Sequence, residues 1–367
     1  MNYIKQLDGI RAIAVMLVII AHWMPQDSLL YRYGDLFNGV DIFFVLSGFL
    51  ITRILLENRR QAERSGSGKG QLLKVFFIRR VLRIFPAYYA ALLLLFLIGP
   101  IWNTGIRDNW GYFVSYTANF YFVKRQAWDG MLSHLWSLSV EEQFYLLWPW
   151  LMLLPGKRTP LCIILTFILL GEAAQYYFWN APMGDIRTIS CFDGLGMGAL
   201  LAYAAVEKPA WLKQAYPYAS VLALLCFLLQ MARITGNSFF IPSRTLTAVC
   251  TVWLITAILL YEGRRVIFFD FILGNPALVF MGKISYGIYL YHNFLPYLTG
   301  GLLRYFNAKF LGETYPALYV LHFENFCLLL LTSYASWRLF EKPILKLKRG
   351  FDYISPLPKP QTAVAQP

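Results

Sequence analysis

Long apolar segments recur along almost the whole chain and are separated by short polar gaps. About 20 apolar residues are enough to cross a bilayer as a helix, and a helix satisfies its own backbone hydrogen bonds there. Charged residues make up only 14% of the 367 residues, well below the roughly 25% of a soluble domain. The sequence therefore predicts an all-α, polytopic membrane bundle. The ten predicted spans are residues 10–26, 38–57, 80–101, 142–155, 160–178, 190–206, 216–234, 244–262, 277–301 and 315–340.

The basic residues indicate how this bundle is oriented. They gather on one side, which the positive-inside rule identifies as the cytoplasm, and an even number of spans places both termini there. The net charge of +13 thus follows from membrane topology, and binding to nucleic acid is not expected. The basic segments are residues 53–83, 157–158, 207–213, 263–265 and the C-terminal tail.

Three polar or mixed segments complete the predicted organisation. Residues 58–73 are rich in Gly, Ser and charge, which predicts a flexible cytoplasmic loop. Residues 1–345 are predicted to form the transmembrane domain, and residues 346–367 a Pro-rich, disordered cytoplasmic tail. Residues 102–135 form an external segment whose many aromatic side chains fit either an interfacial belt or a sugar-stacking surface.

Arg11 and His22 are the unusual residues of the first predicted span. Eleven residues of α-helix turn through about 1100°, so the two side chains share one face, separated by a rise of about 16 Å. Ionisable side chains at such depth are costly and usually mark a pathway or a reaction site. The spacing therefore favours an enzyme over a passive membrane anchor.

Carboxylates are predicted near the outer ends of two other spans. Asp41 begins the second span at a depth similar to that of His22, where it could orient the imidazole or simply cap its own helix. Glu141 and Glu142 open the fourth span, which is short and could extend back to residue 136. Adjacent residues point about 100° apart, so only one carboxylate is expected to face a site, and Glu142 would suit a general base. His134 fits either a structural role or a contact to substrate.

The inner entry to the third span carries Arg80 and Arg83. Residues three apart share a helix face, and a pair of guanidinium groups suits two phosphates, although positive-inside anchoring would also explain them. Cations at the inner mouth and His22, Asp41 and Glu142 towards the outer side fit a phosphorylated donor with a long flexible arm. A coenzyme A thioester has this shape.

The sequence lacks the motifs of nucleotide hydrolysis, dinucleotide binding and serine hydrolases. No P-loop, GxGxxG or GxSxG motif occurs. The five cysteines lie in or beside apolar segments without metal-site spacing, so no metal is expected.

Six motifs follow one another in a characteristic order: LDGIRAIAVMLVIIAH, GVDIFFVLSGFLIT, FFIRRVLRIFPAYY, LWSLSVEEQFYLLWP, GKISYGIYLYHN and WRLFEKP. Through them, residues 3–345 resemble the acyltransferase 3 family, membrane O-acyltransferases that modify bacterial surface glycans. The resemblance implies about ten spans in the bacterial cytoplasmic (inner) membrane, surrounded by membrane lipids. It implies acyl transfer from cytoplasmic acyl-CoA, most commonly acetyl-CoA, to a hydroxyl of an extracytoplasmic glycan or lipid-linked glycan such as O-antigen or exopolysaccharide.

The resemblance also implies that His22 is essential and that Arg11, Arg80 and Arg83 act on the donor. Some relatives carry a further C-terminal esterase domain, whereas this chain ends soon after its last predicted span, which predicts a stand-alone transferase. Two routes stay open, direct attack by a hydroxyl that His22 deprotonates and transfer through an acylated His22. The alternatives are a transporter or flippase with a proton relay of His22, Asp41 and Glu142 and, less in keeping with the short outer loops, a polysaccharide polymerase.

Overall fold

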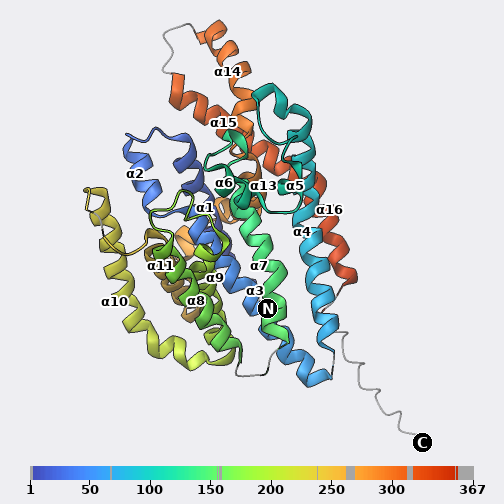
Figure 1. Ribbon diagram of the computed structural model, residues 1–367, viewed down its shortest axis with the longest axis vertical. Coiled ribbons are helices and arrows are strands. Elements are labelled where there is room, and N and C mark those ends of the chain that lie inside the picture. Colours follow the sequence, from blue (N-terminus) through green and yellow to red (C-terminus); the bar gives the residue numbers. More distant parts are fainter. Residues whose placement is uncertain are drawn as a thin grey trace, which may run out of the picture.

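The computed structural model describes residues 3–66, 68–154, 156, 159–237, 239–261, 269–311, 317–351 and 353. The regular elements in these residues are all helices (Figure 1). The longer ones are α1 (Lys5–Trp23), α3 (Gly39–Ser65), α4 (Lys69–Ile98), α7 (Leu135–Leu153), α8 (Thr159–Tyr177), α9 (Phe192–Glu207), α10 (Pro209–Ile234), α11 (Ser243–Leu260), α14 (Leu295–Leu311) and α15 (Ala317–Ser336). The shorter ones are α2 (Leu29–Leu36), α5 (Trp110–Val114), α6 (Ala118–Arg125), α12 (Pro276–Lys283), α13 (Ser285–Tyr291) and α16 (Lys342–Lys346). Single turns of 3-10 or π helix are η1 (Gly99–Trp102), η2 (Gly130–Leu132), η3 (Thr188–Cys191), η4 (Phe269–Leu273), η5 (Trp337–Glu341) and η6 (Leu347–Gly350).

Seven helices in the described residues are long and apolar enough to cross a membrane, namely α1, α3, α4, α8, α9, α10 and α11. Helices α7 and α15 are 19 and 20 residues long but carry more polar side chains. The all-α, multi-pass architecture is confirmed, while the count of ten spans and the cytoplasmic placement of the termini stay predictions. The predicted fourth span does extend back, because α7 begins at Leu135.

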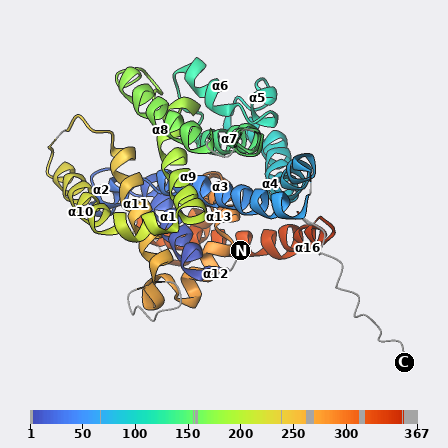
Figure 2. The ribbon, with the colours of Figure 1, turned by 90° about the horizontal axis from the view of Figure 1, so that it is seen from below.

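Helix α10 lies at the edge of the bundle and turns apolar side chains outwards (Figures 1 and 2). Its exposed residues include Leu222, Leu224, Leu225 and Leu228. In water such a surface would be unfavourable, whereas lipid tails solvate it well. This face is therefore a lipid-facing surface of the bundle.

Helices α3 and α9 pack closely at the centre of the bundle because glycines line their interface (Figure 2). A Cβ on Gly48 would lie 2.0 Å from the Leu195 carbonyl oxygen, and one on Gly198 would lie 2.0 Å from the Val45 carbonyl oxygen. Small residues let membrane helices approach in this way. Gly48 and Gly198 thus allow the close approach of α3 and α9.

The prediction of a flexible loop over residues 58–73 is wrong for most of these residues, because they are helical. Helix α3 continues to Ser65 and α4 begins at Lys69, so only a tight turn with Gly66 at φ 70° joins them. Ion pairs at i,i+4 spacing extend α3 beyond its apolar part: Arg53 Nε lies 2.8 Å from Glu57 Oε1, and Arg59 Nε lies 3.3 Å from Glu63 Oε1. The charge that suggested a loop instead supports a helix.

The predicted ninth span, 277–301, is interrupted twice. Helix α12 ends at Lys283, α13 runs only from Ser285 to Tyr291, and α14 starts at Leu295. Interrupted helices in a membrane bundle occur where the backbone is buried in protein or lines a cavity, because lipid cannot satisfy the freed backbone groups. The two breaks place Ser285 and His292 at helix ends inside the bundle.

The C-terminal part of the chain is helical for longer than predicted. Residues 346–350, assigned to the disordered tail, belong to α16 and η6. The remainder of that tail, residues 354–367, lies outside the described residues, as do the basic pairs at 157–158 and 264–265.

Candidate active site

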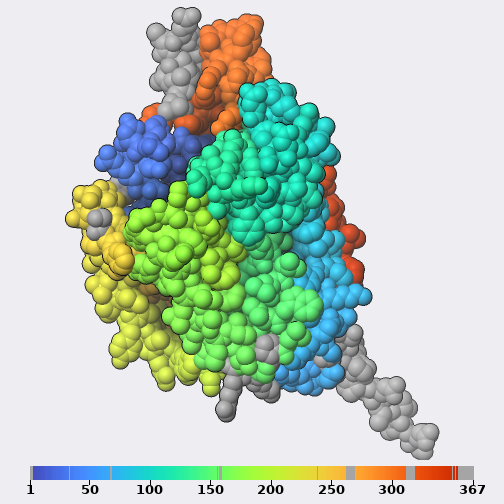
Figure 3. Space-filling model, viewed as in Figure 1, coloured from blue at the N-terminus to red at the C-terminus, as the bar shows by residue number. Residues whose placement is uncertain are grey.

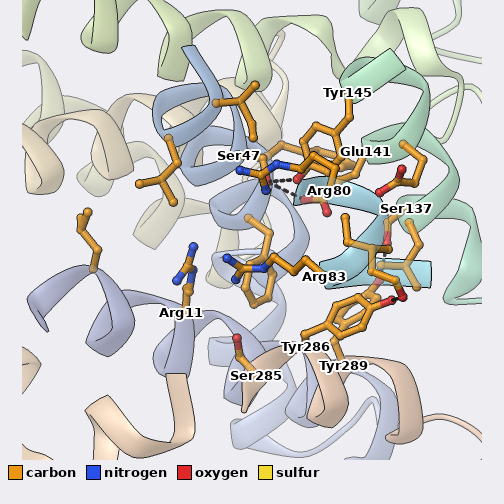
Figure 4. Close-up of a pocket in the computed structure, with 18 of the residues that line it drawn as sticks. Arg11, Ser47, Arg80, Arg83, Ser137, Glu141, Tyr145, Ser285, Tyr286 and Tyr289 are labelled. Atoms are coloured by element: carbon orange, nitrogen blue, oxygen red, sulfur yellow. Dashed lines mark hydrogen bonds between the residues drawn. The ribbon is translucent and has the colours of Figure 1, made fainter. Parts of the chain in front are cut away.

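A cavity of about 290 Å³ lies inside the bundle and is lined by α1, α3, α4, α7 and α13 (Figure 4). Its lining includes four of the six predicted site residues, Arg11, Arg80, Arg83 and Glu142. A cavity of this size is at the lower end of the range for small-molecule sites, which suits a narrow, flexible ligand. Side chains that are more than a hundred residues apart in sequence therefore share one chamber, which we call the inner pocket.

Three guanidinium groups supply the positive charge of the inner pocket. Arg11 Nη1 donates to Asp8 Oδ1 at 2.8 Å, so its charge is partly balanced. Arg80 lies over the rings of Phe76 and Tyr145, with its Cζ 5.5 and 5.4 Å from their centroids. Such stacking orients a guanidinium but does not neutralise it.

Arg83 has a carboxylate, that of Glu341, close enough to act on its charge, but the two side chains form no ion pair. Arg83 opens onto the inner pocket (Figure 4), and no residue in the described part of the chain forms a hydrogen bond or ion pair with it. A cation inside a membrane bundle is costly without a partner. Arg80 and Arg83 therefore both present guanidinium groups to the inner pocket without an ion-pair partner among the described residues.

Glu141 and Glu142 both line the inner pocket, so the expectation that only one of them would do so is wrong. Glu141 Oε1 accepts a hydrogen bond from Ser47 Oγ at 2.7 Å, and Tyr145 donates to the same Ser47 Oγ at 3.0 Å. Ser47 thereby positions this carboxylate (Figure 4). The described residues provide no hydrogen bond to Glu142, which leaves its carboxylate available for a ligand proton.

Hydroxyl groups line the inner pocket on the side of α13. The hydroxyls of Ser137 and Tyr289 are hydrogen-bonded to each other (Figure 4), and both hydroxyl oxygens lie 3.2 Å from the His134 carbonyl oxygen. Because each hydroxyl has a single hydrogen, one of them donates to the other, and the second donates to the carbonyl. The Tyr289 ring centroid lies 5.9 Å from that of His134 and 5.3 Å from that of His292. The pocket therefore borders directly on buried imidazoles.

His22 is not among the residues that line the inner pocket, but it belongs to a cluster of three imidazoles beside it. The His292 ring centroid lies 4.9 Å from that of His22 and 5.1 Å from that of His134, edge to face in both cases. His134 and His292 are fully buried, whereas His22 is accessible. His292 thus connects accessible His22 to the residues at the pocket.

Backbone hydrogen bonds determine which nitrogen of each imidazole carries the proton. The contacts are His22 Nδ1 to the Val18 oxygen at 2.8 Å, His292 Nδ1 to the Tyr289 oxygen at 2.6 Å and His134 Nε2 to the Leu290 oxygen at 3.0 Å. A carbonyl oxygen only accepts, so each of these nitrogens donates and the other nitrogen of a neutral ring has a free lone pair. In the described residues, His134 Nδ1 and His292 Nε2 are buried without a partner. The cluster therefore brings together three imidazole nitrogens that each have a free lone pair.

Asp41 does not have the geometry expected of it. Its Oδ1 accepts from Arg244 Nε of α11 at 2.7 Å, and both side chains are buried. Gly39 explains the direction: a Cβ there would lie 2.0 Å from the Ala14 oxygen, so Gly39 faces α1. Two residues turn a helix by about 200°, which points Asp41 away from α1. The bond that orients His22 comes from Val18 and not from a carboxylate.

Sequence reasoning gave no role to His292 or Tyr289, although both lie in the GKISYGIYLYHN segment. The available signal was a histidine among aromatic residues inside a predicted span. Its importance depends on the helix break at His292, which apolar periodicity alone does not reveal.

The fold and the site together define a polytopic helical membrane protein with an arginine-lined pocket beside a group of three imidazoles. Comparison with protein families gives the particular assignment: residues 4–337 match the model of the acyltransferase 3 family, described as an acyltransferase domain, and the chain belongs to this family.

Curated relatives support the same assignment. The chain is 29% identical over 331 residues to the peptidoglycan O-acetyltransferase OatA of Listeria monocytogenes, an alignment that covers 83% of this chain and 51% of the relative. It is 29% identical over 383 residues to a Staphylococcus aureus protein named "Putative O-acetyltransferase", with 94% of this chain and 58% of the relative covered. The chain thus spans a little over half the length of these relatives. No solved structure matches it.

Proposed function

We propose that this protein transfers an acyl group, in the simplest case acetyl, from acyl-CoA to a hydroxyl of an extracytoplasmic glycan. The observation that carries the proposal is the single chamber in which arginines, two carboxylates and hydroxyl groups meet beside three histidines. Membership of the acyltransferase 3 family supports the reaction class. The names of the relatives point to peptidoglycan as one acceptor to test.

The arginines of the inner pocket would hold the phosphates of the donor. Arg83 and Arg80 are the better candidates, because Arg11 already pairs with Asp8. A phosphate oxygen accepts the bidentate hydrogen bonds of a guanidinium, and such bonds are stronger than those between neutral groups. The narrow remainder of the pocket suits the flexible arm of acetyl-CoA, whose thioester would approach Ser137 and Tyr289.

The imidazole cluster would handle the proton of the acceptor. The glycan hydroxyl attacks the thioester carbonyl carbon, a C–O bond forms, the C–S bond breaks, and the hydroxyl proton passes through a base to the departing thiolate of coenzyme A. His22 Nε2 is accessible and has a free lone pair, so it is the first candidate for that base. His292 lies between His22 and the pocket and would pass the proton on.

In the covalent alternative, the same His22 nitrogen attacks the thioester and forms an acyl-imidazole that the glycan hydroxyl then resolves. In that route the label of the acyl group stays on the protein until acceptor is added. Asp41 has no chemical step in either route, because its carboxylate is committed to Arg244.

The test uses the purified full chain with radiolabelled acetyl-CoA and peptidoglycan glycan chains freed of their peptides. We expect label in the glycan with the wild type and none with His22→Ala. The variant Arg83→Met should raise the KM for acetyl-CoA about tenfold or more, because a charge-assisted hydrogen bond is lost. The matched control is Arg304→Met, which removes an exposed arginine of α14 that lies outside the inner pocket.

Two results would contradict the proposal. Near-normal transfer by His22→Ala would exclude both chemical routes. Movement of acetyl-CoA or glycan across proteoliposomes without chemical change would instead assign the chain to transport.

A further inference from the structure

The segment between α4 and α7 lies at the end of the bundle opposite the C-terminal end of α3 (Figures 1 and 3). A second cavity lies within this segment. Its volume is about 820 Å³, within the roughly 300–1,000 Å³ of small-molecule sites. Residues 100–125 form its wall. We call it the outer cavity, because the predicted orientation of the chain places it outside the membrane.

Asp129 holds the wall of the outer cavity in a defined shape. Its Oδ2 accepts from the Gly105 backbone N–H at 3.0 Å and from the Tyr121 hydroxyl at 3.2 Å, and Arg125 Nη1 lies 3.2 Å away. A Cβ on Gly105 would lie only 2.6 Å from the Tyr121 hydroxyl, so this close approach requires glycine. Because its donors come from Gly105 on one side and from Tyr121 and Arg125 of α6 on the other, this carboxylate holds the two segments against each other.

Several polar side chains of the outer cavity have no partner in the protein. Asn103, Asp108 and Lys124 are exposed, and no hydrogen bond or ion pair joins their side chains to any residue that the structure describes. The Tyr112 ring lies beside them, 5.6 Å from the Tyr121 ring between centroids. An amide, a carboxylate and an ammonium next to aromatic rings form a surface suited to the hydroxyls and apolar faces of sugars.

The side chains that line the outer cavity carry more positive than negative charge, which bears on the kind of ligand that could bind there. Arg107, Lys124 and Arg125 line it against the single carboxylate of Asp108. Arg107 is occupied by the carbonyl oxygens of residues 96 and 97, and Arg125 by Asp129, which leaves Lys124 as the available cation. A positive surface favours a ligand with acidic groups.

The wall of the outer cavity is connected to the histidine cluster. One residue after Asp129, the Gly130 carbonyl oxygen accepts from Asn293 Nδ2 at 3.0 Å, and Asn293 follows His292 in the chain. The same loop then leads to His134 at the start of α7. A ligand in the outer cavity would therefore lie next to a segment that positions both buried imidazoles.

We infer that the outer cavity binds the acceptor glycan, as a hydroxyl-rich chain with carboxylate groups. The inference rests on the proposed function and adds the acceptor class and its binding residues. Asn103, Asp108 and Lys124 bind the sugar, the Tyr112 ring packs against it, and the hydroxyl to be acylated extends from the cavity towards His22.

The test compares three substitutions of exposed side chains, which leave the core untouched. Lys124→Gln and Asp108→Asn remove charges, and Asn103→Gly removes the amide while tolerating the backbone φ of 52°. Lys309→Gln on α14 is the control for loss of an exposed positive charge. The acceptors are peptide-free peptidoglycan glycan chains with free carboxylates and the same chains after carboxyl reduction.

We expect Lys124→Gln to raise the KM for the glycan about tenfold, the value of one lost hydrogen bond to a charged group, with kcat and the KM for acetyl-CoA unchanged. Asn103→Gly, which removes a neutral amide, should raise it by less. Asp108→Asn should change it least, because it weakens an acceptor for sugar hydroxyls but also removes a charge that repels the glycan carboxylates. Carboxyl reduction should abolish the difference between wild type and Lys124→Gln. An unchanged acceptor KM in all three variants, with active wild type, would overturn the inference.

Direct binding of the same glycan chains, followed by surface plasmon resonance, separates this inference from the proposed reaction. If the wild type transfers no acyl group, the proposed function fails, yet weaker glycan binding by Lys124→Gln than by Lys309→Gln would still support the cavity. Equal binding by these two variants would overturn it in that case too.

Discussion

The ion pair of Asp41 and Arg244 decides between a catalytic and a structural role for Asp41. The pair joins α3 to α11 at 2.7 Å, with side chains 5% and 8% exposed. Arg244 Nη1 also donates to the carbonyl oxygens of Asp185 and Ser190 at 2.9 Å. Removing one member of a buried pair leaves the other charge uncompensated and costs about 3–5 kcal/mol.

The burial of this ion pair sets the loss of thermal stability that we expect for Asp41→Asn. An unfolding entropy of about 2.1 cal/mol/K per residue over 367 residues gives about 0.8 kcal/mol/K. A loss of about 3–5 kcal/mol then lowers Tm by about 4–6 °C. The double variant Asp41→Asn/Arg244→Met should lose less stability than the sum of its single variants, because each single variant leaves one buried charge unpaired and the double variant leaves none.

The assay is thermal unfolding of purified protein in detergent, paired with acyl transfer measured well below the lowered Tm. We expect Asp41→Asn to keep turnover within a few-fold of wild type under those conditions. A variant with wild-type Tm and turnover reduced a hundredfold would refute the reasoning and return Asp41 to the catalytic role that the sequence suggested.

Three further outcomes follow from the structure. The variant His292→Asn keeps a donor for the Tyr289 carbonyl oxygen but lacks the lone pair of Nε2. Turnover should therefore fall about a hundredfold or more, with Tm unchanged. Normal turnover in this variant would exclude the proton relay. Gly198→Leu should abolish folded protein in size-exclusion chromatography, because its Cβ meets the Val45 oxygen, whereas Gly300→Leu, which has open space, should not. Burial and the charges of the α4 arginines lower the pKa of Lys348 to about 7. Between pH 7 and the higher pKa of the unfolded chain the native state binds fewer protons, so Tm should rise with pH there, and a Lys348→Met variant with the same slope would contradict this.

Apolar run length and local spacing were enough to predict the parts of the fold that depend on local properties of the chain. The all-helical, multi-pass architecture follows from how lipid treats unpaired backbone groups. The spacing of Arg80 and Arg83 placed both on one face before any tertiary contact was known, and both line the inner pocket. The prediction of a loop at residues 58–73 was wrong, because the charged residues that are typical of a loop can also form ion pairs at i,i+4 spacing along a helix.

Contacts between distant segments decided the rest of the candidate site. Gly39 packs against α1 and thereby fixes the rotation of α3 about its axis. This rotation places Asp41 beside Arg244, which is 203 residues away in the chain. A helix break placed His292 beside His22, although 270 residues separate them. The sequence by itself determined that long apolar helices recur along the chain and which polar residues they carry, because these are properties of single helices. Only the tertiary structure decided which of those residues meet, because helix rotation and close approach depend on the side chains of every neighbouring helix.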